Sequence, residues 1–346
     1  MKYFYLNSYE RTASWSISKP DDCMIFGEIV WNCKNKYNIS ICSDNKFYEL
    51  NEKSERIIPS QKFRTDHLPI LKSNLQKCVR RKKIDIGMKT SVSMSKIIDN
   101  YGDQVGLFEL LRRMTIIVIE DALLFYEYNL LVWFLCVMTK KLVVRTYTLS
   151  WILEIINSVI GSKWQDKTYL HTSCEKFDTG EYVEKILKSN ITHDKKNLLL
   201  SILFRNSFGG MKCDVIMLNN SVVVWLNRFM KGEDILIIEE MNYFFPLEKC
   251  SYDELDADDI LDEAIDFHCS NICDRIRKYV DIKEEYLKKL IWDYSSSINV
   301  RDNISKSASN NEYNNKHNKK NIEKWKVIMP IFLICSNEIK NILFIE

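Results

Sequence analysis

Residues 71–84 read Leu71-Lys72-Ser73-Asn74-Leu75-Gln76-Lys77-Cys78-Val79-Arg80-Arg81-Lys82-Lys83-Ile84. Leu71, Leu75 and Cys78 recur at helical spacing, so the stretch predicts an α-helix with one apolar face. Pro69 suits the first turn of such a helix. The cations fall away from the apolar face, which predicts a basic side that faces solvent.

Apolar stripes with the same spacing continue along the chain. They predict further helices at 84–98, 107–114, 151–161, 198–203, 216–229, 258–279 and 284–294. Residues 24–26, 28–31 and 38–42 are instead short, β-branched or aromatic runs between polar turns, and they predict a small antiparallel sheet. The predicted fold class is therefore mainly α, a multi-helix bundle with a small β-rich N-terminal segment.

Changes of composition predict four segments. A β-rich segment at 1–62 precedes a helical domain at 63–300. Residues 301–323 contain almost nothing apolar, which is typical of a disordered linker. Residues 324–346 are apolar again, but Pro330 interrupts them, so we predict a C-terminal helix or strand docked on the domain.

Composition limits the function classes. The formal net charge is only +2, so a nucleic-acid surface has to be local. Eleven Cys residues are scattered and odd in number, which is typical of a reducing intracellular compartment, the cytoplasm or the nucleus. The longest apolar run, 115–138, contains Glu120, Asp121 and Glu127, and carboxylates are costly inside a bilayer. It is predicted to be a core element, and no membrane partner is expected.

Positive charge is concentrated in the opening stretch, which has six Lys or Arg residues and no acid. A helix with cations on its outer face can follow a nucleic-acid backbone and release its counterions. An ordinary solvated face, whose C-terminal cations the helix dipole favours, explains the same pattern. The predicted nucleic-acid-binding residues are Lys72, Lys77, Arg80, Arg81, Lys82, Lys83 and Lys212.

Lys212 joins that set because it follows Gly209-Gly210, a Gly pair in a chain with only nine Gly residues. Glycines permit positive φ, and the backbone N–H groups of such a loop can face a phosphate. A turn between two helices that Asp214 caps is the structural alternative.

A second group of charges lies between apolar residues, at Arg112, Arg113, Glu120 and Asp121. Seven residues, or about two helical turns, separate Arg113 from Glu120. We predict a half-buried structural charge cluster whose members are paired with each other or with a neighbouring helix.

The order of these motifs resembles the C-terminal helical region of clamp-loader-related AAA+ ATPases, such as the bacterial replication-associated recombination protein and the Werner-helicase-interacting ATPase. Ser73, Leu75, Gln76, Lys77 and Arg80 carry the match, followed by Arg112-Arg113 and Glu120-Asp121. The match covers about residues 73–121. The resemblance implies an all-helical collar that oligomerises on a DNA-bound machine. The chain has no Walker A loop, so ATP hydrolysis is not implied; the gap between the motif halves is longer, and no Gly follows Asp121.

Two further features have structural explanations. The run 253–263 holds seven carboxylates and no base, without EF-hand spacing. A solvated loop explains it, and it could also contact the basic helix or a partner. His268, Cys269 and Cys273 lack the spacing of a zinc finger, so the cysteines are predicted to be core residues and no metal site is predicted.

We therefore expect a non-enzymatic accessory factor of DNA replication or repair. It would bind nucleic acid, DNA in preference, or a replication protein through the basic helix, with no cofactor. A helical scaffold or interaction protein without nucleic-acid affinity is the alternative, and a carboxylate- or metal-dependent nucleic-acid enzyme is a third reading. Self-association is left open.

Overall fold

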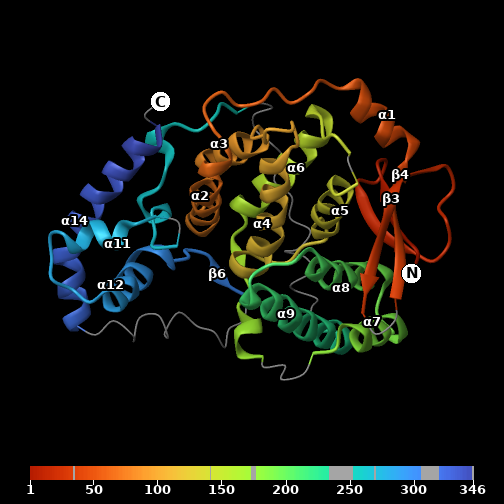
Figure 1. The fold of residues 1–346 in the computed structure, drawn as a ribbon. Helices are drawn as coiled ribbons and strands as arrows, with labels where there is room; N and C mark the ends of the chain where they lie inside the picture. Colours follow the sequence, from red (N-terminus) through yellow and green to blue (C-terminus); the bar gives the residue numbers. More distant parts are fainter. Residues whose placement is uncertain are drawn as a thin grey trace. The chain divides into compact units, whose positions relative to one another are not determined.

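The chain is mainly α-helical with a small N-terminal sheet, as predicted (Figure 1). The structure, a computed structural model, describes residues 1–33, 36–140, 142–172, 177–233, 252–268, 270–304 and 319–344. These residues form two compact units that interleave along the sequence. Unit 1 contains residues 1–58, 111–155 and 166–245, and unit 2 contains residues 59–110, 156–165 and 246–346. The predicted helical domain at 63–300 is thus divided between both units.

The sheet belongs to unit 1 and has the strand order β2-β1-β4-β3. Its strands are β1 (Tyr3–Asn7), β2 (Thr12–Ser16), β3 (Cys23–Asn32) and β4 (Lys36–Asp44). β1 pairs with β4 in parallel, whereas the other two pairings are antiparallel. The predicted strand segments at 24–31 and 38–42 lie in β3 and β4, which pair antiparallel as expected. The parallel pairing of β1 with β4 was not predicted, because local sequence pattern does not reveal it.

One face of the sheet packs on helices of its own unit. Trp133 is fully buried, and its Nε1 donates to the carbonyl oxygens of Phe4 and Cys42, both at 3.1 Å. Trp15 donates through Nε1 to Ser201 Oγ at 3.1 Å, which ties β2 to α8. The helices of this unit are α1 (Asn45–Lys53), α5 (Tyr128–Met138), α7 (Thr179–Lys188), α8 (His193–Arg205) and α9 (Lys212–Lys231).

Two helices run from one unit into the other along the chain. They are α4 (Val105–Asp121) and α6 (Thr146–Gly161). The apolar run 115–138 therefore comprises the end of α4, the connection 122–127 and all of α5, and most of its hydrophobic side chains are buried. Among the described residues, the structure contains no helix that is both long and apolar enough to cross a membrane.

Unit 2 is helical. Its helices are α2 (Leu68–Arg81), α3 (Ile84–Ser95), α11 (Ile272–Arg277), α12 (Glu284–Ile291) and α14 (Lys319–Phe344). The prediction of one helix at 258–279 was wrong. The chain there makes two short 3₁₀ turns, η4 (Ala257–Asp259) and η5 (Asp262–Ala264), before α11 begins. Closely spaced Asp residues favour such turns because their carboxylates accept bonds from nearby backbone N–H groups.

The C-terminal segment forms the helix α14, which packs on α11, η4 and η5. Most of the predicted linker lies outside the described residues, at 305–318. Free thiols are present at Cys23, Cys42, Cys78, Cys136, Cys213, Cys273 and Cys335. Cys174, Cys250 and Cys269 lie outside the described residues.

Close packing at the start of α4 leads to a first prediction. A Cβ on Gly106 would lie 2.1 Å from the carbonyl oxygen of Met94 and 2.7 Å from Ile97 Cβ. Since backbone atoms would have to move, Gly106→Ala should destabilise the protein by about 1–3 kcal/mol or more. Urea denaturation measures this loss. An unchanged midpoint would show that α3 and α4 do not approach so closely.

Candidate functional site: cationic helices and an acidic strap

The predicted basic helix is α2, but its basic side is not the solvent face that was predicted. Leu71, Leu75 and Cys78 are fully buried as expected. Lys77 and Arg80, which were expected on the opposite, solvent side, are only 3% and 4% exposed. That part of the prediction was wrong, because α2 is covered on a second side by a distant part of the chain.

The other four predicted cations of residues 71–84 differ in exposure. Lys72 and Arg81 are half-buried, and Lys72 pairs with Glu109 at 2.8 Å. Lys82 and Lys83 are exposed in the turn that separates α2 from α3. Lys82 ends α2 in the left-handed conformation at φ 56°, and its N–H donates to the carbonyl oxygens of the last helical turn.

The buried cations of α2 have specific partners within unit 2. Lys77 Nζ lies 3.0 Å from Asp266 Oδ2, and both side chains are almost fully buried. Arg80 Nη1 donates to the carbonyl oxygen of Ser296 at 2.9 Å, and its guanidinium lies over the ring of Trp292. These contacts position the helix, because a buried charge has to be paired and hydrogen-bonded.

Asp266 belongs to a segment that we call the acidic strap, residues 252–268. Four apolar side chains anchor the strap in the core, Leu255, Ile260, Ala264 and Ile265, none of them more than 1% exposed. Backbone groups are held as well. Asn74 Oδ1 of α2 accepts from the N–H of Leu261 at 2.9 Å, and Ser93 Oγ of α3 accepts from the N–H of Leu255 at 2.8 Å.

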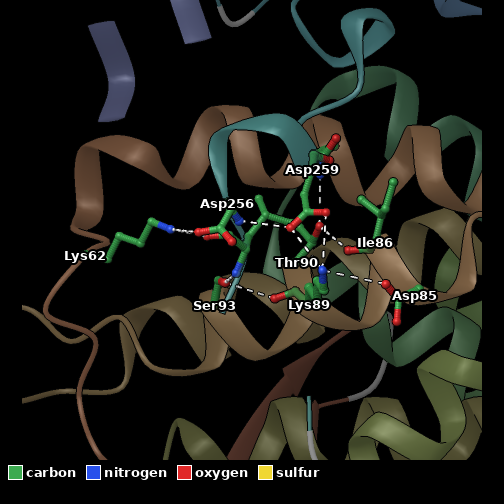
Figure 2. A network of polar contacts seen from close by, with 10 residues as sticks. Lys62, Asp85, Ile86, Lys89, Thr90, Ser93, Asp256 and Asp259 are labelled. Atoms are coloured by element: carbon green, nitrogen blue, oxygen red, sulfur yellow. Dashed lines mark hydrogen bonds and ion pairs between the residues drawn. The ribbon is translucent and has the colours of Figure 1, made fainter. Parts of the chain in front are cut away.

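The carboxylates of the strap face cations of the same unit (Figure 2). Lys89 of α3 lies 3.3 Å from Asp259 and 3.7 Å from Asp85, and Lys62 pairs with Asp256. Further pairs join Glu254 to Lys96 at 3.1 Å, Glu263 to Arg81 at 3.1 Å, and Asp262 to Lys340 at 2.7 Å. The acidic run thus neutralises the basic helices within the molecule, which is one of the alternatives that its sequence left open.

Ion pairs at the strap shift the pKa values of Asp256 and Lys89 in the directions that favour their charged forms. The hydrogen bond from Lys62 lowers the pKa of Asp256, and the bond to Asp259 raises the pKa of Lys89. Asp256 is largely exposed, so its individual contribution to stability is small, whereas Lys89 is half-buried.

Lys212 is exposed and belongs to unit 1, at the start of α9. Gly209 and Gly210 have the predicted positive φ angles, 72° and 151°. Asp214 Oδ2 accepts from the N–H of Met211 at 3.1 Å, so the loop is an interhelical turn that Asp214 caps. The capped turn was the structural alternative for this motif.

The same turn receives a buried arginine that sequence reasoning missed. Arg205 is 1% exposed and donates to Thr115 Oγ1 at 2.6 Å and to the carbonyl oxygens of Gly209 and Arg112 at 2.7 and 3.0 Å. Burial lowers the pKa of its guanidinium. No local pattern marked it, because Arg205 ends an otherwise ordinary amphipathic helix.

An ion pair between Arg228 and Asp166 in unit 1 was also missed by the sequence analysis. Arg228 Nη1 donates to Asp166 Oδ2 at 2.6 Å, and Thr168 Oγ1 donates to Asp166 Oδ1 at 2.6 Å. Asp166 and seven further residues line a cavity of about 10 Å³, which has room for about one water molecule. Such a cavity is too small for a substrate.

The predicted charge cluster lies in unit 1, on α4. Arg112, Arg113 and Glu120 are half-buried and Asp121 is 2% exposed. The pairing of these charges stays a prediction. Within the described part of the chain, no group of three His, Cys, Asp or Glu side chains is placed to hold a metal ion. Cys269 lies outside that part, so the His268-Cys269-Cys273 set is not described as a whole.

No family model, curated protein or solved structure matches this chain. The resemblance to the clamp-loader collar therefore stays a prediction. Several residues that carry it, including Leu75, Lys77 and Arg80, are buried in α2. A functional proposal for this chain therefore has to rest on its own side-chain contacts.

Proposed function

We propose that the protein is a helical scaffold or interaction protein, and that its basic helix organises the fold and does not bind nucleic acid. The buried ion pair between Lys77 and Asp266 supports this proposal most directly. A cation that contacts phosphate has to be accessible, whereas Lys77 and Arg80 are both covered by their own chain. Lys72 and Arg81 are engaged in ion pairs as well.

Exchange of the strap for a nucleic acid would be costly. Removal of the strap would expose its four apolar anchors and leave Lys77 buried without its carboxylate. Phosphates would have to compensate for both losses. The strap therefore behaves as an integral part of unit 2, and an electrostatic attraction of nucleic acid to α2 is opposed by the carboxylates that lie on it.

An accessory factor of DNA replication or repair is the second candidate. One observation favours it: Lys82 and Lys83 are consecutive, exposed cations in the α2–α3 turn. Consecutive lysines can contact adjacent phosphates of a DNA or RNA backbone. This candidate would place the nucleic-acid contact at the turn and not along the helix.

A titration of the protein with DNA and RNA at low salt separates the two candidates. The scaffold proposal expects no binding. The matched variants are Lys82→Glu/Lys83→Glu and, as a control with the same charge change, Lys185→Glu/Lys188→Glu on the exposed side of α7. Binding by the wild type would contradict the proposal if the slope of log affinity against log salt fell by about 2 in the first variant and not in the control.

A further inference from the structure

Two cysteines of the N-terminal sheet are neighbours on adjacent strands. In the antiparallel pair of β3 with β4, Cys23 is opposite Asp44. Two positions further along β3, Ile25 is opposite Cys42. Residues two apart on a strand share a face, and so do residues that lie opposite each other. Cys23 and Cys42 are therefore diagonal neighbours on one face of the sheet, and both are free thiols.

The two thiols differ in their access to solvent. Cys23 is half-buried, whereas Cys42 is fully buried. Burial, followed by the charge and the hydrogen bond of the neighbouring Cys23, raises the pKa of the Cys42 thiol to about 12. Cys42 therefore keeps its proton at neutral pH, and a small solute reaches the sulfur of Cys23 first.

We propose that Cys23 and Cys42 form a peroxide-sensitive modification site, in which oxidation joins β3 to β4 by a disulfide. The thiolate of Cys23 attacks hydrogen peroxide: an S–O bond forms, the O–O bond breaks, and hydroxide leaves to take up the proton that Cys23 released. The sulfur of Cys42 then attacks the sulfenic acid of Cys23. An S–S bond forms, the S–O bond breaks, and the hydroxyl leaves as water with the proton of Cys42. Two thiols and one peroxide thus give one disulfide and two waters.

The place of β3 in the sheet allows the two sulfur atoms to meet. Diagonal neighbours usually lie further apart than a relaxed disulfide permits, so one strand has to shift. In the part of the chain that the structure describes, β3 is the edge strand of the sheet. Its register on β4 already shifts between Ile25 and Gly27, which makes this pairing irregular. A disulfide formed in this way is strained, and strained disulfides are easily reduced, so we expect a reversible modification.

Peptide mass spectrometry of the full chain tests the site. The protein is treated with hydrogen peroxide, the remaining thiols are alkylated, and the chain is cleaved with trypsin. We expect a linked pair of peptides that contains Cys23 and Cys42, lighter by two hydrogen atoms than the separate peptides, and dithiothreitol should release it. Cys33 lies on the same tryptic peptide as Cys23. The experiment is therefore repeated with Cys33→Ser, in which the link should persist.

Single variants assign the two roles. In Cys42→Ser, Cys23 should accumulate as a sulfenic acid that dimedone traps, because no second thiol reacts with it. In Cys23→Ser, Cys42 should stay a thiol, since it is buried. The control is Cys213→Ser, which removes an exposed thiol of α9 and should leave the yield of the linked peptides unchanged. Circular dichroism checks that each variant is folded.

Three results with the wild type would overturn the inference, whether or not the variants fold. The first is that Cys23 is oxidised to a sulfinic or sulfonic acid while Cys42 stays a thiol. The second is a link from Cys42 that disappears in Cys33→Ser. The third is that both thiols remain unreacted under conditions that oxidise Cys213. None of these results bears on the proposed scaffold function, whose readout is the nucleic-acid titration.

Discussion

Lys77→Met is expected to lower the free energy of unfolding by about 3–5 kcal/mol. The substitution keeps the length of the side chain but leaves the carboxylate of Asp266 buried without its cation, 3.0 Å from the former ammonium position. Removal of one partner of a buried pair is costly for this reason. Urea or thermal denaturation measures the loss, which should be large enough to be visible as a lower midpoint.

The double variant Lys77→Met/Asp266→Asn provides the matched test. Because it removes both charges, it should recover a large part of the stability that Lys77→Met loses. Lys62→Met serves as a surface control, since the Lys62–Asp256 pair is exposed and should contribute about 0–1 kcal/mol. Equal losses for Lys77→Met and Lys62→Met would show that the strap does not bury its central pair.

Arg205→Met should destabilise unit 1 by about 2–4 kcal/mol. Two terms oppose each other here. The substitution removes the hydrogen bonds to Thr115 Oγ1 and to the carbonyl oxygens of Gly209 and Arg112, and it also removes the desolvation cost that lowers the pKa of the guanidinium. Thr115 Oγ1 still donates to the carbonyl oxygen of Arg112 at 2.9 Å. The lost hydrogen bonds should nevertheless dominate, because water reaches this place poorly.

Arg205→Lys gives the sharper comparison. Lysine keeps a buried charge but cannot reproduce the forked geometry that reaches three acceptors. We therefore expect it to be at least as destabilising as Arg205→Met, although it is the conservative change. Arg277→Met, at an exposed pair with Glu284, should cost less than about 1 kcal/mol. A well-tolerated Arg205→Lys would contradict the proposed role of the fork.

Local periodicity located α2 and its apolar face correctly, because Leu71, Leu75 and Cys78 face the core directly. It misplaced Lys77 and Arg80, because a single stripe identifies one buried side and says nothing about a second. The acidic strap covers the second side, and its Asp266 lies 189 residues after Lys77 in the chain. The strap contains the 3₁₀ turns η4 and η5, which include Asp residues. In the helical pattern these residues were read only as the polar side of a helix, so the turns were not predicted.

The sheet shows the same limit. Residues in β3 and β4 were recognised from their β-branched and aromatic runs, and a hairpin joins them. β1 and β2 were missed, and the parallel pairing of β1 with β4 joins residues 37 positions apart, such as Tyr3 and Ser40. Arg205 was missed for a related reason: its acceptors lie on α4 and in a turn, and no local motif joins them.

The distance along the chain between α2 and the strap has a consequence for synthesis. Lys77 leaves the ribosome 189 residues before Asp266. At about 5–20 residues per second, the interval is roughly 10–40 s. During that time the helix cannot bury Lys77 and Arg80 in their final environment, since the carboxylate and carbonyl oxygens that receive them do not yet exist. Unit 2 therefore cannot complete its folding before residue 266 has been synthesised.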